Sequence, residues 1–175
     1  MLCFIALSVF GATDNNTDTN SNIVHYTYNA KRMVFDKKTG VTILKGDAKV
    51  VKLDAQMKET GDYVNGDQIT LYTKHDDTTG TDKFTKMEAM GNVKMKQGDM
   101  AVTCARAVMV YDPEEVIDME GTKDAPAVAD DGKNKIVAPL IKYFRKDDRL
   151  EAEGDVSGQI TIEEKKEEKK ENTEK

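Results

Sequence analysis

Apolar and polar residues alternate with a period of two over most of the chain, from about residue 23 to residue 162. This spacing is typical of β-strands that bury one face, whereas an amphipathic helix repeats every ~3.6 residues. Four times in this region, a short apolar run ends in an aromatic residue, turns, and returns to a glycine, at Gly46, Gly91, Gly121 and Gly154. We expect each passage to be a pair of antiparallel strands. One pair cannot bury its apolar face alone, so neighbouring pairs should stack.

Counting outward from each repeat glycine selects one apolar face. Around Gly91 it selects Met87, Ala89, Val93 and Met95, while Glu88, Asn92, Lys94 and Lys96 fall on the opposite face. The glycine lies on the apolar side, where a side chain would crowd a bend. We expect the following residues to line one continuous interior: Met33, Phe35, Leu44, Ala48, Val50, Met87, Ala89, Val93, Met95, Met109, Tyr111, Ile117, Met119, Ile141, Tyr143, Leu150, Ala152 and Val156.

Polar segments divide these runs. The connections at 36–40, 112–115 and 145–149 have the length and composition of hairpin turns. We expect a further turn at 61–66, which begins and ends with glycine, and an exposed hairpin tip at 74–83. The sequence therefore predicts an all-β protein.

The N-terminal segment predicts export. Residues 1–12 form an apolar run that closes on small residues, and this run is shorter than the ~20 residues that span a bilayer. We interpret it as a signal peptide, followed by a polar linker at 13–22. Residues 23–162 would form the β-domain, and the Glu- and Lys-rich residues 163–175 a disordered charged tail. Export would place the protein outside the cytoplasm, and the family resemblance given below implies the periplasm.

Composition narrows the classes of function. The net charge is −6, the pI is about 5.1, and no cationic cluster occurs outside the tail. Binding to nucleic acid phosphates requires a basic stripe, so we expect no nucleic acid partner. Methionine is abundant, with 9 residues, and tryptophan is absent. Methionine is a flexible gap-filler that is common on surfaces accommodating varied apolar partners, although at strand spacing it also packs ordinary cores.

The sequence contains no recognisable catalytic motif. His25 and His75 lie far apart and have no metal-ligand spacing to Cys or carboxylates. No nucleophile elbow or phosphate-binding loop is present. Signal cleavage would leave Cys104 as the one cysteine, which we expect to be buried and unreactive. We therefore predict no enzyme activity, no cofactor and no metal.

Several segments of the repeat resemble those of a known protein family. Residues 30–36 leading to 44–48, and residues 90–100, 105–112 and 150–156, resemble the OstA-type repeats of the LptA family of periplasmic lipopolysaccharide-transport proteins. The resemblance implies a twisted OstA-type β-jellyroll of repeated antiparallel strands, with two sheets in a V that is open at both ends. It implies acyl chains in the cleft. It also implies partners that carry the same repeat, namely an inner-membrane LptC-like component and the OstA-like domain of the outer-membrane translocon.

Three functions remain open from the sequence. The first is a bridge that carries lipopolysaccharide or a related glycolipid from the inner to the outer membrane, with acyl chains in an apolar groove. The second is a structural or adhesive exported β-repeat protein with a closed, packed core. The third is an LptC-like component of the same transport system. The first two differ in whether the interior is open.

An open stack of strands leaves unpaired backbone groups on its first and last strands. The leading edge at 23–28 is uncharged, and the trailing edge at 155–162 carries a single charge and no proline. Such edges favour strand addition, so we expect head-to-tail self-association or pairing with a repeat-bearing partner. The expected edge residues are Ile23, Val24, Tyr26, Tyr28, Val156, Ile160 and Ile162.

Overall fold

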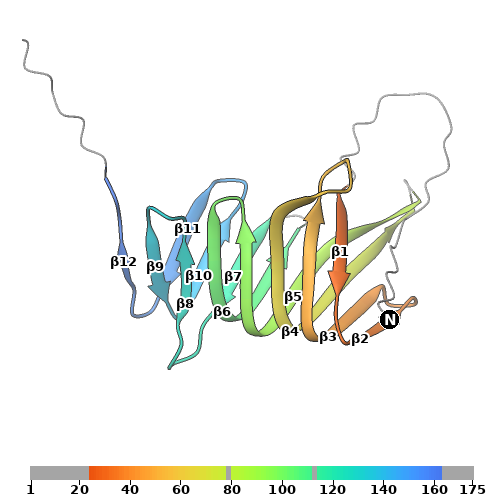
Figure 1. The fold of residues 1–175 in the computed structure, drawn as a ribbon, viewed down its shortest axis with the longest axis horizontal. Helices are drawn as coiled ribbons and strands as arrows, with labels where there is room; N and C mark the ends of the chain where they lie inside the picture. Colours follow the sequence, from red (N-terminus) through yellow and green to blue (C-terminus); the bar gives the residue numbers. More distant parts are fainter. Residues whose placement is uncertain (1–23, 78–79, 112–113, 163–175) are drawn as a thin grey trace, which may run out of the picture.

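A computed structural model describes residues 24–77, 80–111 and 114–162. Within these residues the chain forms 12 β-strands, which follow one another along the long axis of the molecule (Figure 1). The prediction of an all-β, unclosed antiparallel fold is confirmed. The predicted signal peptide, polar linker and charged tail, together with Ile23, lie outside the described residues, and the domain limits remain predictions.

The strands differ greatly in length, because four of them continue through both layers of the fold. Their bounds are β1 His25–Asn29, β2 Arg32–Asp36, β3 Val41–Leu53, β4 Glu59–Asp76, β5 Thr81–Gln97, β6 Met100–Val110, β7 Val116–Glu120, β8 Ala127–Asp130, β9 Lys135–Ala138, β10 Leu140–Phe144, β11 Arg149–Glu153 and β12 Ser157–Gln159.

The long strands β3, β4, β5 and β6 fold over near their middle, so the sheet divides into two halves. Half-sheet A contains β1, the second half of β3, the first half of β4, the second half of β5, the first half of β6, and then β8, β9 and β12. Half-sheet B contains β2, the other halves of the four long strands, and then β7, β10 and β11. All of these pairs are antiparallel. The two halves thus form the two layers of the expected jellyroll.

The fold-over points coincide with the repeated dipeptides of the sequence. At Gly46-Asp47 the two φ angles are 78° and 48°, and at Gly91-Asn92 they are 74° and 47°. Glycine adopts such angles freely, and Asp and Asn are among the side-chain-bearing residues that tolerate them best. The pairing register shifts at the same places. The Gly-Asp or Gly-Asn dipeptide is therefore the corner at which a strand passes from one half-sheet to the other.

The four passages read from the sequence are the four hairpins of half-sheet B. They pair β2 with β3, β4 with β5, β6 with β7, and β10 with β11. The prediction of antiparallel strand pairs is confirmed for each. Half-sheet A is formed by the opposite ends of the same strands and by β1, β8, β9 and β12.

The prediction of a turn at 61–66 is wrong, because these residues lie inside β4. The turn instead occupies 54–58, where Asp54 Oδ1 accepts hydrogen bonds from the backbone N–H groups of Gln56 (2.9 Å) and Lys58 (2.8 Å). An aspartate that satisfies backbone donors two to four residues ahead is a strong local turn signal. Gly61 and Gly66 lie where the backbone of β4 is irregular, and they do not end the strand.

The hairpin tip expected at 74–83 is shorter than predicted. The strands continue through most of this segment, with His75 opposite Asp82 and Asp76 opposite Thr81. His75 Nδ1 lies 2.8 Å from Asp82 Oδ1, and this contact raises the pKa of the exposed imidazole. Cross-strand polar pairs therefore extend the β4–β5 hairpin beyond the body of the sheet (Figure 1).

The core lies between the half-sheets. Its largest fully buried side chains include Leu44, Ile69, Met87, Met119 and Ile141, each at most 1% exposed. Alanine side chains add to this core, and the buried ones are Ala48, Ala89, Ala107, Ala127, Ala129 and Ala138.

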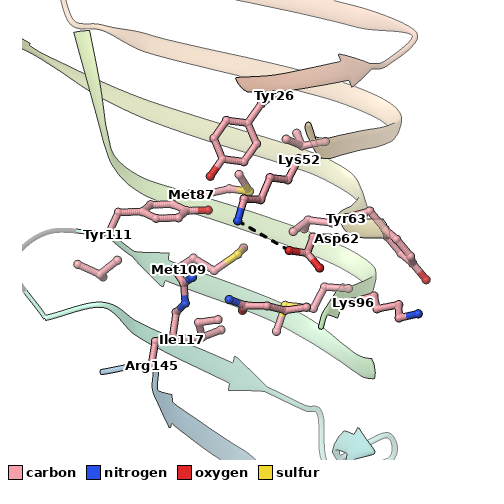
Figure 2. A pocket seen from close by; sticks show the side chains of 15 residues that line it. Tyr26, Lys52, Asp62, Tyr63, Met87, Lys96, Met109, Tyr111, Ile117 and Arg145 are labelled. Carbon is pink, nitrogen blue, oxygen red and sulfur yellow. Dashed lines mark ion pairs between the residues drawn. The ribbon is translucent and has the colours of Figure 1, made fainter. Parts of the chain in front are cut away.

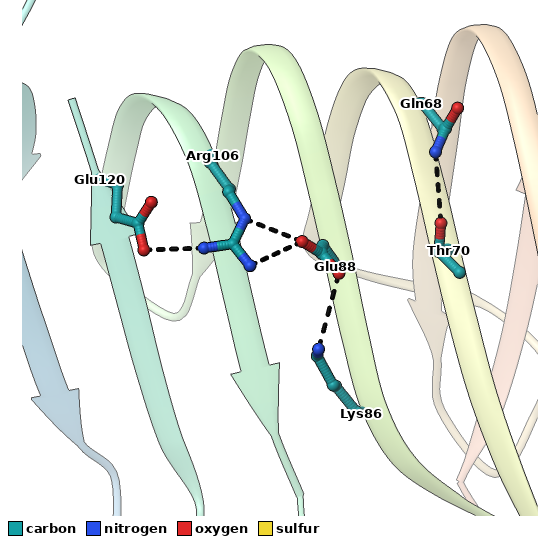
Figure 3. A network of polar contacts seen from close by, with 6 residues as sticks. All are labelled: Gln68, Thr70, Lys86, Glu88, Arg106 and Glu120. Carbon is teal, nitrogen blue, oxygen red and sulfur yellow. Dashed lines mark hydrogen bonds and ion pairs between the residues drawn. The ribbon is translucent and has the colours of Figure 1, made fainter. Parts of the chain in front are cut away.

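A polar network ties together three strands on the outer face of half-sheet B (Figure 3). Arg106 donates to Glu88 Oε1 from Nε (2.8 Å) and to Glu120 Oε1 from Nη1 (2.7 Å). Lys86 lies 3.5 Å from the other Glu88 oxygen. Partial burial raises the pKa of Glu88, but the Arg106 hydrogen bond and the nearby cations outweigh it and hold the pKa below its usual value. Half-exposed pairs of this kind contribute modestly to stability, so we interpret the network as holding β5, β6 and β7 in register.

Candidate functional site

Most of the residues expected to line the interior do face it. Tyr111, Tyr143, Leu150 and Ala152 are partly buried and pack against the core. The members that are at most 5% exposed are Leu44, Ala48, Val50, Met87, Ala89, Val93, Met95, Met109, Ile117, Met119 and Ile141. The period-two count therefore identified the inner face of the sheet. Binding of lipid to these residues remains a prediction.

Met33, Phe35 and Val156 are more exposed than a position in the interior requires, at 42%, 48% and 52%. Met33 lies opposite Leu44 in the β2–β3 register and so shares its face. Its exposure arises because β2 is the outermost strand of half-sheet B and no further strand covers it. Val156 follows the corner after β11, at the opposite end of the stack, where the sheet also ends. These three residues therefore lie near the ends of the stack, because the period-two count gives the face but not the distance from an edge, and their place in a groove remains a prediction.

The interior is a packed core in this structure. The buried side chains of both half-sheets form one contiguous cluster, with little solvent exposure at any member. An acyl chain could enter only if the half-sheets separated on the side away from the corners. That side, where the hairpins of the two half-sheets face each other, is the mouth of the V.

A cavity of about 70 Å³ opens at the mouth (Figure 2). Its floor is apolar and its rim is polar or aromatic, and we call it the mouth pocket. The floor consists of Val50, Val64, Met87, Met95, Met109 and Ile117, and the rim of Tyr26, Lys52, Asp62, Gln97, Tyr111 and Arg145. Tyr63 and Lys96 also border it, but their side chains point away from its centre in Figure 2.

Aromatic side chains close one side of the mouth. The Tyr26 and Phe84 rings meet edge-to-face with centroids 5.2 Å apart, and the Phe84 and Tyr111 centroids are 6.4 Å apart. Figure 2 shows the two tyrosine hydroxyls pointing toward one another, and each is close enough to influence the other. Burial raises the pKa of both phenols. Because Tyr26 belongs to β1 of half-sheet A and Tyr111 follows β6 in half-sheet B, this contact bridges the two layers.

On the other side of the mouth, polar contacts connect the two half-sheets. With its amide oxygen facing the guanidinium, Gln97 accepts hydrogen bonds from Arg145 Nε (2.8 Å) and Nη2 (2.9 Å). Gln97 ends β5 in half-sheet A, while Arg145 follows β10 in half-sheet B. Nearby, Lys52 Nζ lies 4.0 Å from Asp62 Oδ2. The mouth is therefore held by aromatic contacts on one side and by a polar contact between the half-sheets on the other.

The sequence analysis did not identify the polar rim. The signal was present, because Lys52, Asp62, Gln97 and Arg145 all fall on inward positions when the alternation is continued from Val50, Val64, Met95 and Tyr143. A charged residue at an inward position usually suggests that the strand has ended. Here it indicates the place where the interior meets solvent.

The remaining titratable groups do not form a second site. Cys104 is 9% exposed, as expected, and burial raises the pKa of its thiol to about 11. In residues 24–77, 80–111 and 114–162, no group of three or more His, Cys, Asp or Glu side chains is placed to hold a metal ion. The same part of the chain has no helix long and apolar enough to cross a membrane.

The structure places the expected assembly edges at the ends of half-sheet A. Within residues 24–77, 80–111 and 114–162, β1 pairs with β3 alone and β12 with β9 alone, so each has one side with no partner among these residues. Only Ser157–Gln159 of the trailing segment is a strand. Among the expected edge residues, two are half-buried, Tyr26 and Tyr28. Three are more exposed: Val24 (46%), Ile160 (77%) and Ile162 (79%). Half-sheet B has its own open edges at β2 and β11, which the sequence analysis did not identify.

Comparison with solved structures assigns the fold. The chain matches LptH from Pseudomonas aeruginosa, the LptA homologous periplasmic component of a conserved lipopolysaccharide transport device, with a TM-score of 0.58 and 14% sequence identity. The match covers 78% of this chain and 95% of that one. No family profile and no curated protein matches the sequence. The chain therefore has the LptA-type fold, as its repeats suggested.

Proposed function

We propose that this protein is a non-catalytic lipid-binding bridge that carries lipopolysaccharide or a related glycolipid through the periplasm between the inner and outer membranes. The observation that carries the proposal is an uninterrupted apolar interior between two half-sheets of an unclosed sheet. Likeness in fold to a periplasmic transport component supports it. Acyl chains would lie between the half-sheets, and the polar part of the lipid would lie outside the mouth.

Entry of a lipid requires the two layers to move apart. Each buried methylene contributes roughly 0.8 kcal/mol, so several acyl chains can offset the loss of direct packing between the layers. The interior is well suited to exchange one apolar neighbour for another, because Met87, Met95, Met109 and Met119 have flexible side chains that repack easily. The corners would act as the closed side of the V, so opening would widen the mouth.

Cross-linking at two adjacent positions tests the groove. Met95 is 3% exposed and faces the interior, whereas Lys94 is exposed on the outer face of the same strand. A photoreactive residue at position 95 should trap glycolipid in cells, and the same residue at position 94 should not. Mass spectrometry of the adducts is the measurement. Equal labelling at both positions would contradict the groove.

We also propose head-to-tail assembly through the edges of half-sheet A. β12 of one molecule would pair with β1 of the next, or with a repeat-bearing LptC-like or translocon domain. Each edge strand has an open hydrogen-bonding side, and large apolar side chains lie exposed beside it. Because such a contact joins two different surfaces, it should produce open, concentration-dependent oligomers.

Lysine substitutions test this assembly. The double variant Ile160→Lys/Ile162→Lys places charge beside the trailing edge and should shift the protein toward monomer, because edge lysines oppose strand pairing. Met57→Lys is the matched control, since Met57 is 56% exposed but lies in the β3–β4 turn. Sedimentation equilibrium over a range of concentrations provides the comparison. Equal association by both variants would argue against the β12 edge.

A structural or adhesive protein is the second candidate, and the packed interior favours it. Such a protein would need no bound lipid, and its methionines would serve only as core. Extraction of lipid from protein purified out of its own envelope separates the two, since a bridge should retain glycolipid and a closed core should not. An LptC-like component of the same system would share the groove, and an uncleaved N-terminal segment in the mature protein would identify it.

A further inference from the structure

The rim of the mouth pocket contains a cation with only a neutral partner. The Arg145 guanidinium donates to the Gln97 amide oxygen at 2.8 and 2.9 Å. Among the residues that the structure describes, no carboxylate lies within ion-pair distance of it, although the other three arginines include two with carboxylate partners, Arg106 and Arg149. A guanidinium binds a carboxylate or phosphate about twice as strongly as a neutral acceptor. Arg145 is therefore the donor on this rim most ready to exchange its partner for an anion.

A second cation lies on the same rim. Lys52 is 4.0 Å from Asp62, at the outer limit of an ion pair, and both side chains are partly exposed. The other Asp62 oxygen accepts a hydrogen bond from the backbone N–H of Gly98 at 2.9 Å, which holds the carboxylate toward the β5–β6 turn. Two cations thus face one carboxylate across the pocket, and the rim has a net positive charge in a protein whose overall charge is −6.

The hydroxyls of Tyr26 and Tyr111 add two further groups to the rim. They point toward one another in the closed mouth (Figure 2), and as phenols they carry a proton for donation at neutral pH. If the mouth widened, this contact would break and the hydroxyls would need new acceptors. A tetrahedral oxyanion has enough acceptor oxygens to engage the arginine and the hydroxyls together.

The apolar floor of the mouth pocket indicates which kind of molecule would carry the bound anion. Met87, Met95 and Met109 line the same pocket and belong to the apolar interior, and Figure 2 shows Met87 and Met109 among the rim side chains. A free inorganic anion would contact the rim alone and gain nothing from this floor. An anion carried at the end of an acyl chain would satisfy both, with its charge on the rim and its chain against the methionines.

We propose that the mouth pocket is a recognition site for the phosphate group of an anionic lipid, with Arg145 as its principal ligand and Lys52, Tyr26 and Tyr111 as supporting ligands. Binding would replace the Arg145–Gln97 and Tyr26–Tyr111 contacts, so recognition of the phosphate would release two of the contacts between the half-sheets and leave the Tyr26–Phe84 ring contact. This inference rests on the proposed lipid-carrying function and adds the head-group chemistry that the site would select.

Titration of the full chain with matched amphiphiles tests the site. Dodecyl phosphate and dodecyl maltoside have the same chain and differ in the charge of the head group, and inorganic phosphate has the charge without the chain. By isothermal titration calorimetry below the critical micelle concentrations, dodecyl phosphate should bind about tenfold tighter than dodecyl maltoside, as expected of hydrogen bonds to a charged group. Inorganic phosphate should bind far more weakly than either.

Three variants test which residues cause the preference for dodecyl phosphate. Arg145→Gln should remove the preference, so that dodecyl phosphate binds no more tightly than dodecyl maltoside does to the same variant. Lys52→Gln should reduce the preference by a smaller factor, and it provides a second readout if Arg145→Gln fails to fold. Lys123→Gln removes an exposed charge in the loop between β7 and β8, on the corner side of the molecule, and should behave as wild type.

Each other outcome overturns a specific statement. Equal affinity for the two amphiphiles, or a preference that survives both Arg145→Gln and Lys52→Gln, would overturn the phosphate site and leave the lipid-carrying function standing. Equal affinity for inorganic phosphate and dodecyl phosphate would show a free-anion site, which also overturns the inference. Binding of neither amphiphile would contradict the proposed function itself.

Discussion

Replacing Ile141 by alanine is expected to lower the free energy of unfolding by about 2–5 kcal/mol, the range for large-to-small substitution in a packed core. Ile141 is 0% exposed. It is the second residue of β10, and it lies opposite Met119 on β7 and Ala152 on β11. The substitution would leave a cavity that these strands cannot close without losing their own pairing. Urea denaturation followed by far-ultraviolet circular dichroism measures the change.

Ile160→Ala is the matched control. Ile160 is 77% exposed, so the same chemical change should alter the free energy of unfolding by less than about 0.5 kcal/mol. A cost at Ile141 as small as that at Ile160 would show that the interior is not packed in solution. Such a result would favour a groove that stands open without lipid, whereas the expected result means that lipid must displace packed side chains.

Gly40→Ala is expected to lower the free energy of unfolding by about 3 kcal/mol, from left-handed backbone strain and overpacking combined. Gly40 ends the β2–β3 turn with a φ of 66°. Its carbonyl accepts hydrogen bonds from the backbone N–H (2.9 Å) and the hydroxyl (3.0 Å) of Thr73, which anchors this turn to β4. An added Cβ would collide with the Thr73 carbonyl oxygen, a backbone atom that cannot move without disturbing β4.

Gly80→Ala separates the two contributions. Gly80 has nearly the same φ, 65°, and a Cβ there would meet nothing within 4 Å. It should therefore show only the backbone strain, about 1 kcal/mol. Thermal or urea unfolding of the two variants side by side gives the difference. Equal losses of stability would mean that the close approach of the β2–β3 turn to β4 does not persist in solution.

The packed interior and the contacts across the mouth indicate how a lipid carrier with this fold would stay closed when it is empty. Three contacts bridge the half-sheets at the mouth: Tyr26 with Phe84, Tyr26 with Tyr111, and Gln97 with Arg145. A protein that hands lipid along a chain of copies needs an interior that is closed when empty, because an exposed apolar groove would promote aggregation. Closure by a few polar and aromatic contacts meets this need at a modest energetic cost.

The repeat in the sequence determined a large part of the fold. Period-two alternation and its fixed phase relative to the glycines identified the strands, the inner face and the four hairpins of half-sheet B. This was possible because alternation and turn chemistry are local properties of the backbone. The same locality explains the error at 61–66, where two glycines inside a long strand have the composition of a turn.

Tertiary structure alone decided which inward positions are buried and what surrounds the mouth. Met33 and Leu44 lie on one face of paired strands, yet one is 42% exposed and the other 0%, because burial depends on how many strands lie beyond. The partners Gln97 and Arg145 come from different half-sheets and meet only when the sheet folds over at its corners. Alternation along one strand specifies a direction for each side chain, and the fold of the whole sheet determines what that side chain meets.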